Sequence, residues 1–278
     1  MYDIYSKSEV EFRKLLYTEL SDLVVNNKLI YKYMDFEIGV KTLNNQTIAF
    51  SSPLEVNDPY DCYLPLIDYK NIPIEYIQYI IKTYPTHFDR DTREKLLTQT
   101  SEDIYNMMKD ILDKGWRNDL SKRRISCFSE TFSNLLMWSH YGKSHSGICI
   151  GFDLGILYES IRSSSDSERL LIKVNYSKDF VSMDYYEHPW ESVINWLRTK
   201  SIDWEYEKEI RMILYDLEFE KNLQIKLIDS SSFVSVFLGS KISKENEDRI
   251  QLIINEKLPK VIIKKMILSN NKFEVVPI

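Results

Sequence analysis

Apolar positions recur along the chain with two different periods, which predict an alternation of helices and strands. Between residues 8 and 27 they follow the i, i+3, i+4 spacing of an amphipathic helix. Shorter runs of β-branched, aromatic and aliphatic residues, bounded by turn residues, are typical of strands. The predicted strands are 29–33, 47–51, 125–129, 147–152, 170–176, 207–215, 223–228, 233–238, 261–268 and 273–276; the further predicted helices are 74–81, 90–97, 102–120, 134–141, 189–200 and 243–256. This order predicts an α+β fold with a mixed, mostly antiparallel sheet.

The stretch from residue 61 to residue 120 is helical in pieces and contains no predicted strand. Ser101 is the expected cap of its third helix. Because no repeat, linker or low-complexity tract divides the chain, we expect residues 1–278 to form a single α+β domain that carries 61–120 as a helical insertion.

The charge is balanced and evenly spread, with 36 basic and 42 acidic residues and a net charge of −6. Such a chain is a poor match for a general nucleic-acid coat or for a protein that binds anionic membranes. Two short basic patches, Lys122–Arg124 and Lys264–Lys265, leave a nucleic-acid reader open as an alternative, although patches of this size are usually solvated surface.

The cysteines and glycines exclude several common sites. Cys62, Cys127 and Cys149 lie far apart and form no CxxC pair, so neither a disulfide framework nor a zinc ribbon is expected. The seven glycines provide neither a GxGxxG dinucleotide fingerprint nor a P-loop. Without a leader or an apolar stretch of about 18 residues, the sequence predicts a cytoplasmic protein with no membrane partner.

The main candidate for catalysis is the acidic run at residues 204–213. In an extended strand from residue 207, the side chains of Glu207, Glu209 and Arg211 share one face, with the carboxylates about 7 Å apart. The arginine can then keep one carboxylate ionised while the second polarises a hydroxyl or stabilises a cationic transition state, as glycosyl transfer requires. The alternative is a solvated strand face on which these charges pair, and a charge run in isolation favours it.

A second candidate site surrounds two of the four histidines. Trp138 and Tyr141 could stack on a planar ring, with His140 as a hydrogen-bonding partner. A zinc site using His140 and His145 would need further ligands at a cleaner spacing, so no metal is predicted. The alternative is a helix end packed by Trp138, with a histidine bonded to the backbone.

Polar side chains also follow two predicted strands. Ser51 and Asn57 lie where a strand ends in a sharp turn, and Ser129 with Glu130 ends another strand. Asn57 could present its amide to a ribose or a phosphate, although such residues most often stabilise their own turn. No GxSxG elbow for a serine hydrolase is present.

Taken together, these motifs resemble an uncharacterised, mainly bacterial family, domain-of-unknown-function family 2971. The residues that carry the resemblance are LIYKY at 29–33, FSSP at 50–53 with NDP at 57–59, ISCFS at 125–129, LMWSHY at 136–141, HSGICIGF at 145–152, and WEYEKEIR at 204–211 after Lys200. This resemblance implies a grouping and no activity.

The chain also has a looser similarity to the ADP-ribosyltransferase fold, through a polar residue on an early strand, a serine ending a second strand, and an ExE pattern. That fold holds NAD in a cleft between two small sheets without a glycine fingerprint. The resemblance implies that Glu209 contacts the nicotinamide ribose and supports an oxocarbenium-like state, and that Glu207 addresses the acceptor. Ser51 would brace the ribose and the glutamate, and Tyr31 or Lys32 would meet the phosphates or the amide.

The similarity to the ADP-ribosyltransferase fold predicts an NAD-consuming ADP-ribosyltransferase or NAD glycohydrolase. NAD or a related nucleotide would be the co-substrate, the acceptor an unidentified macromolecule, and the setting a bacterial toxin or phage defence. Glu209, Glu207 and Arg211 would form the catalytic centre, projecting into a hollow around residues 51, 129 and 140. The expected cofactor-binding residues are Tyr31, Lys32, Ser51, Asn57, Ser129, Trp138, His140 and Tyr141. The alternative is a noncatalytic module that binds a nucleotide or a protein.

Overall fold

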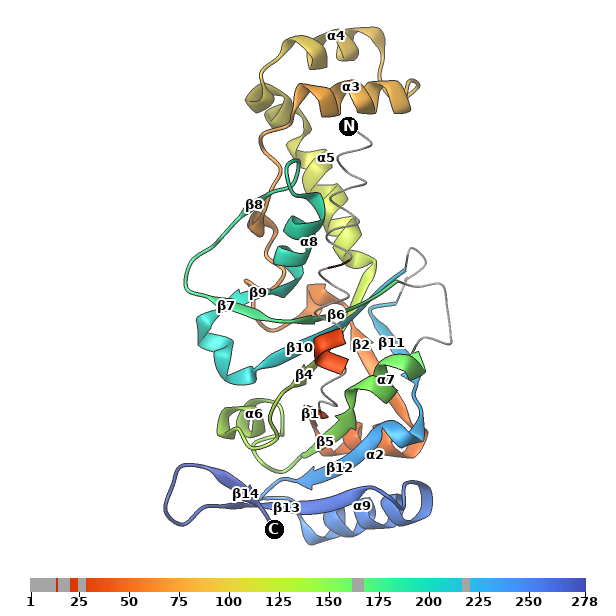
Figure 1. Cartoon of the computed structure of the whole chain (residues 1–278), viewed down its shortest axis with the longest axis vertical. Helices are drawn as coiled ribbons and strands as arrows, with labels where there is room; N and C mark the ends of the chain where they lie inside the picture. Colours follow the sequence, from red (N-terminus) through yellow and green to blue (C-terminus); the bar gives the residue numbers. More distant parts are fainter. Residues whose placement is uncertain (1–13, 15–20, 25–28, 162–167, 217–220) are drawn as a thin grey trace.

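The computed structural model describes residues 14, 21–24, 29–161, 168–216 and 221–278 (Figure 1). Residues 14 and 21–24 are helical, and the rest of the predicted helix 8–27 lies outside the described residues. The molecule is elongated, with a sheet-rich part at one end and the helices α3 and α4 at the other (Figure 1).

The largest sheet is mixed and mostly antiparallel, which confirms the predicted fold class. Its strands are β1 (Leu29–Met34), β2 (Thr47–Ser51), β4 (Arg123–Ser129), β5 (Ile148–Asp153), β6 (Glu168–Lys173), β10 (Glu209–Tyr215), β11 (Leu223–Leu227), β12 (Phe233–Leu238), β13 (Ile262–Leu268) and β14 (Val275–Pro277). The order is β11-β2-β4-β1-β5-β12-β13-β14, with β10 pairing with β4 and β6. Among the described strands of this sheet, only β12 and β13 pair in parallel.

Two small parallel sheets lie beside it: β3 (Ile67–Asp68) pairs with β8 (Met183–Asp184), and β7 (Asn175–Ser177) with β9 (Thr199–Ser201). The sequence predicts one continuous strand over 170–176. This prediction is wrong, because the structure has two separate strands there, β6 and β7. The chain leaves the large sheet at Val174, whose N–H donates to the carbonyl of Glu209, and then pairs with β9. This second pairing brings β9, and with it Lys200, next to the start of β10.

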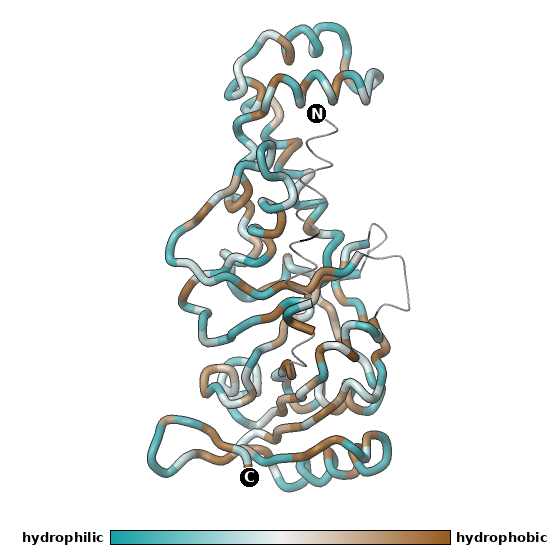
Figure 2. The backbone as a smooth tube through the Cα atoms, in the orientation of Figure 1, coloured by the Kyte–Doolittle hydropathy of each residue, from teal (hydrophilic) through white to brown (hydrophobic). Residues whose placement is uncertain are grey.

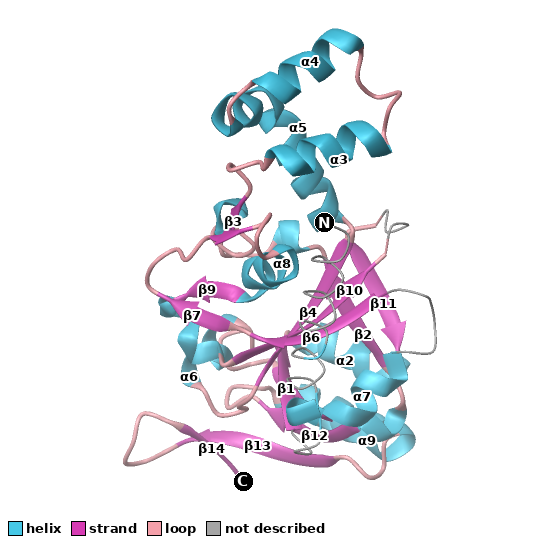
Figure 3. Ribbon diagram, turned by 45° about the horizontal axis from the view of Figure 1, so that its top comes forward, coloured by secondary structure: helices cyan, strands magenta, loops and turns pink. Residues whose placement is uncertain are grey.

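The helices are α2 (Phe36–Asn45), α3 (Ile74–Thr83), α4 (Arg90–Thr98), α5 (Ser101–Ser121), α6 (Leu135–His140), α7 (Leu154–Ile161), α8 (Pro189–Arg198) and α9 (Lys244–Lys257). In Figure 3, α2, α7 and α9 gather around the sheet. They bury Leu43, Leu157 and Ile250 in one apolar core with Phe152 of β5. Hydrophobic stretches accordingly follow the strands, whereas much of α4 is hydrophilic (Figure 2).

Helix α7 was not expected from the sequence. It begins directly after β5, and the Asp153 carboxylate accepts a hydrogen bond from the Ile156 N–H in its first turn. Because the apolar run continues from the strand into the helix, periodicity gives no boundary, and Asp153 as a cap is the one local signal.

Helices α3, α4 and α5 fall where the sequence predicts helices and share a small core of Ile72, Ile77, Leu96 and Ile104. The cap of α5 is Thr100 and not the predicted Ser101. Thr100 Oγ1 accepts from the Asp103 N–H at 3.2 Å, while the Asp103 carboxylate accepts from the Thr100 N–H. The Ser101 hydroxyl instead donates to the carbonyl of Ile72 and fastens α5 to the incoming chain. That these helices form an insertion within one domain stays a prediction.

Replacing Gly147 with alanine is expected to destabilise the fold. A Cβ at Gly147 would lie 2.3 Å from the Met34 carbonyl oxygen, and backbone cannot move aside as a flexible side chain can. Overpacking of this kind costs about 1–3 kcal/mol or more. In the matched control, Gly115→Ala on α5, a Cβ meets nothing within 4 Å. That change should stabilise by about 0.5–1 kcal/mol. Urea unfolding of both variants measures the difference, and equal stability would contradict the predicted clash.

Candidate functional site

Arg211 of β10 is buried between two carboxylates. Its Nε and Nη2 donate to Glu209 at 2.7 and 3.1 Å, and its Nη1 and Nη2 donate to Asp61 at 2.7 and 2.6 Å. A further Nη1 hydrogen bond of 2.9 Å ends on the carbonyl of Leu197. All five N–H groups of the guanidinium therefore have an acceptor, and each carboxylate is held by two parallel bonds.

Lys200 of β9 is the second cation at this site. Its Nζ donates to Glu207 Oε2 at 2.7 Å and to Glu209 Oε2 at 3.3 Å, with Asp61 Oδ2 3.9 Å away. We call Asp61, Lys200, Glu207, Glu209 and Arg211 the charged cluster. None of the five is more than 8 % exposed. Such a concentration of buried charge is costly unless every member is paired, as here.

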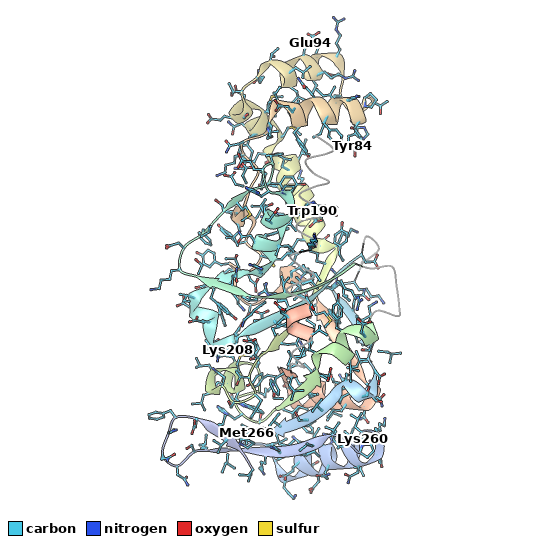
Figure 4. The ribbon with its side chains drawn as sticks, viewed as in Figure 1. Tyr84, Glu94, Trp190, Lys208, Lys260 and Met266 are labelled. Atoms are coloured by element: carbon cyan, nitrogen blue, oxygen red, sulfur yellow. The ribbon has the colours of Figure 1, made fainter. Side chains whose placement is uncertain are left out.

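Glu207 belongs to the charged cluster, but the backbone around it is not the strand that the sequence predicts. It ends the 3-10 helix η4 (Ile202–Glu207), Lys208 is left-handed with φ 45°, and β10 begins only at Glu209. The exposed Lys208 marks this turn in Figure 4. The predicted extension of the strand to residue 207 is therefore wrong, because the chain turns at Lys208. Glu209 and Arg211 do share one face of β10, and Glu207 meets them from the turn.

The environment pushes the pKa values of the two glutamates apart. Burial would raise the pKa of Glu209, but Arg211 and Lys200 beside it outweigh burial and hold it at about 2. For Glu207, burial outweighs the opposing effects of Lys200 and Tyr141, so its pKa is raised above the ordinary value. With all three carboxylates ionised, the cluster has two positive and three negative charges. A proton on Glu207 would make it neutral.

Two half-buried tyrosines, Tyr141 and Tyr206, lie beside Glu207. The Tyr141 hydroxyl donates to Glu207 Oε1 at 2.6 Å and accepts a long, 3.4 Å hydrogen bond from the Asn57 amide. His140 stacks on Tyr206 at 6.1 Å between centroids. Of the predicted cofactor-binding residues, the structure thus brings Asn57, His140 and Tyr141 together beside the cluster.

Ser129 and Lys32 reach the neighbourhood of the cluster in other ways. The buried Ser129 hydroxyl donates to the backbone carbonyl of Glu207 and so holds the end of η4. Lys32 Nζ donates to the carbonyl of Cys127 at 2.8 Å. Burial lowers the pKa of Lys32, and the negative charge of Glu209 opposes that effect.

The structure does not bring Tyr31, Trp138 and Ser51 to the cluster. The Tyr31 ring packs on Phe132 in an apolar group that also includes Tyr141 and Tyr206, and makes no contact with the charged cluster in the described structure. Trp138 is completely buried in the same group, with its indole N–H bonded to a backbone carbonyl, so neither face of its ring is free for stacking. Ser51 ends β2 as an exposed residue between β4 and β11.

Sequence reasoning missed three members of this site. Asp61 lies 150 positions from Arg211 in the chain, and Lys200 lies beyond the end of α8. The Tyr176 hydroxyl accepts a hydrogen bond from the Glu209 N–H at 2.8 Å. For Lys200 the available signal was its place among the residues that carry the family resemblance, whereas no local pattern marked Asp61.

A cavity of about 1090 Å³ lies between residues 53–71 and α5, and Asp61 and Cys62 line part of it. None of the eight predicted cofactor-binding residues lines this cavity. The charged cluster therefore borders the cavity through Asp61, whereas Tyr141 contacts the cluster at Glu207.

Glu209 should make the stability of the protein depend on acid pH. Its pKa is about 2 in the folded protein against 4.5 ordinarily, so the stabilisation is complete above pH 4.5 and is lost as the pH falls towards 2. The shift corresponds to a stabilisation on the order of 3 kcal/mol. Urea unfolding between pH 7 and pH 3 should show this loss in the wild type and a flatter profile in Glu209→Gln. Glu94→Gln, on the exposed face of α4, is the control and should follow the wild type.

Within the described ranges, no group of three or more His, Cys, Asp or Glu side chains has an arrangement that could hold a metal ion. None of the helices in the described part of the chain combines the length and apolar composition that a membrane span requires.

The fold and the site define an α+β protein with a buried charged cluster where β9, η4 and β10 meet. The family model described as "Protein of unknown function (DUF2971)" matches residues 137–212, which confirms the predicted resemblance over that part of the chain. This segment contains Lys200, Glu207, Glu209 and Arg211, whereas Asp61 lies outside it. No curated protein and no solved structure matches the chain.

Proposed function

We propose that the chain is an enzyme that cleaves the bond between nicotinamide and ribose in NAD, with the charged cluster as its catalytic centre. The observation that carries the proposal is the pair of glutamates, both bonded to Lys200, whose pKa values are shifted in opposite directions. Two carboxyl groups driven apart in this way are the usual arrangement for acid–base chemistry at a glycosidic bond.

The two carboxyl groups would have different roles in this reaction. As the bond from ribose C1′ to the nicotinamide nitrogen breaks, its electron pair leaves with nicotinamide, and positive charge develops on the ribose. The ionised Glu209 carboxylate stabilises that charge. A water or an acceptor hydroxyl then bonds to C1′, and Glu207 takes the proton that it releases. Arg211 holds Glu209 in its ionised form and in a fixed orientation.

Access to the Glu207 carboxylate would be through Tyr141. Its hydroxyl covers Glu207 Oε1, but the residue is only half-buried, and Asn57 and His140 beside it are exposed. Rotation of the Tyr141 side chain therefore uncovers Glu207 without breaking the ion pairs of Arg211. The ADP-ribosyl acceptor and a toxin or phage-defence setting belong to the same proposal and rest on the resemblance alone.

One observation favours the alternative, a noncatalytic module that binds a nucleotide or a protein. Every N–H group of Arg211 is occupied, and the Glu209 side chain is only 3 % exposed. A fully satisfied network of this kind can act purely as a brace that fixes β9, η4 and β10. Exposed residues around it, such as Asn57 and His140, would then contact the partner.

Release of nicotinamide from NAD, followed by chromatography, separates the two functions. The enzyme should liberate nicotinamide at a rate proportional to protein concentration, together with ADP-ribose when water is the acceptor. Calorimetric titration with NAD and ADP-ribose supplies the second measurement. Binding without release would support a nucleotide-binding module, and silence in both would overturn the proposed reaction.

A further inference from the structure

Three cations line the cavity beside α5, and none of them has a carboxylate partner among the described residues. We call this space, between residues 53–71 and α5, the α5 groove; it measures about 1090 Å³. Lys70 comes from the loop, and Lys109 and Arg117 come from α5, where a spacing of eight residues places them on similar sides of the helix. Among the residues that the structure describes, none of the three forms an ion pair with a carboxylate, which leaves their charges available to an anion.

The carboxylates of the groove are mostly engaged by the protein. Asp61 is held by Arg211, Asp113 accepts from the Tyr69 hydroxyl at 2.6 Å, and Asp68 accepts from the Lys70 N–H. Glu102, in the first turn of α5, is exposed. The groove therefore presents both positive and negative side chains. A ligand that carries only negative charge, such as a simple polyanion, would not match it.

Asp58 supplies an unsatisfied acceptor in the same groove. It is 4 % exposed, and its Oδ1 accepts from the Tyr60 N–H at 2.9 Å. Its Oδ2 is buried without a hydrogen-bond partner in the described structure. A buried carboxylate oxygen without a donor is unfavourable, so a ligand hydroxyl or amino group placed there would be bound with a gain in free energy.

Aromatic side chains complete the lining. Tyr69 lies between Tyr105 and Trp116, with centroid distances of 6.1 and 6.0 Å, and the half-buried rings of Tyr63 and Tyr105 border the groove. Such rings offer a surface on which a heterocyclic base can stack.

We propose that the α5 groove binds a nucleotide. Phosphate oxygens accept from Lys109, Arg117 and Lys70, a ribose hydroxyl donates to Asp58 Oδ2, and the base packs on the tyrosine rings. A nucleotide presents all three kinds of group at once, and the volume is that of a small-molecule site. The inference goes beyond the proposed function, because it assigns a nucleotide site to a groove that borders the charged cluster at Asp61, whereas Tyr141 contacts the cluster at Glu207.

Calorimetric titration of the full chain with ADP and ADP-ribose tests the groove. The double variant Lys109→Glu with Arg117→Glu should bind both at least about tenfold more weakly than the wild type, equivalent to 1.4 kcal/mol. Lys114→Glu is the matched control, since Lys114 is exposed on the same helix and does not line the groove, and its affinity should be unchanged. Circular dichroism verifies that all three proteins are folded.

The outcomes separate this inference from the proposed reaction. No binding of ADP or ADP-ribose by the wild type, or equal binding by wild type and double variant, would overturn the groove, even if NAD is cleaved. Binding that is weakened only in the double variant supports the groove. If nicotinamide is then not released, the groove stands and the catalytic proposal fails.

Discussion

Replacing Arg211 with methionine is expected to lower the free energy of unfolding by about 3–5 kcal/mol at neutral pH. The change leaves Asp61 and Glu209 buried, and Lys200 then remains as the single cation for three carboxylates. A side chain of similar length fills the space, so the loss is mainly that of charge compensation and hydrogen bonds. Urea unfolding, followed by tryptophan fluorescence, measures the effect.

Two companion variants show whether the loss comes from uncompensated charge. Arg90→Met on α4 also removes an arginine from an ion pair, but that pair is exposed, and the expected cost is below about 1 kcal/mol. Adding Asp61→Asn to Arg211→Met removes one of the stranded charges and should restore part of the stability. If Arg211→Met and Arg90→Met were equally stable, the cluster would not be the electrostatic centre of this region.

The second large effect concerns turnover of NAD. Glu209→Gln keeps the shape of the side chain but removes the charge that stabilises the ribosyl cation, so kcat should fall about 100- to 1,000-fold. Glu207→Gln should lower kcat and should also abolish the decrease in rate at acid pH. In the wild type the rate falls as the pH drops through the raised pKa of Glu207, because the protonated group cannot accept a proton.

Glu205→Gln is the control for both changes, because Glu205 is exposed in the same 3-10 helix and contacts none of the charged cluster in the described structure. Its activity and pH profile should equal those of the wild type. Undiminished turnover by Glu209→Gln would remove that residue from the mechanism, whatever the effect at Glu207.

Most of the sheet could be predicted from sequence, because its strands are short apolar runs bounded by turn residues. The runs at 29–33 and 233–238, for instance, correspond to β1 and β12. The ends of a strand could not be predicted in this way where they depend on pairing with a distant segment of the chain. The turn at Lys208 has no glycine or proline to mark it, and the break at Val174 depends on pairing between β7 and β9.

The candidate site likewise combines contacts that the local sequence predicts with contacts that it does not. The contact between Glu209 and Arg211 follows from strand alternation alone, since the two residues are separated by one position. Asp61 and Lys200 are brought to Arg211 by the folding of distant segments, and no local pattern reports such a contact. For Trp138 the sequence left two interpretations open, a stacking surface and a packed helix end, and the structure agrees with the second, because the ring is completely buried.

A carboxyl ¹³C NMR titration of the glutamates tests the central claim, that one cluster drives the pKa values of Glu207 and Glu209 in opposite directions. The Glu207→Gln and Glu209→Gln variants assign the two signals. We predict that, as the pH is lowered from 8, the Glu207 carboxyl takes up its proton above pH 4.5, whereas Glu209 stays ionised to below pH 3, with a pKa of about 2. Two signals that both titrate near pH 4.5 would contradict the account.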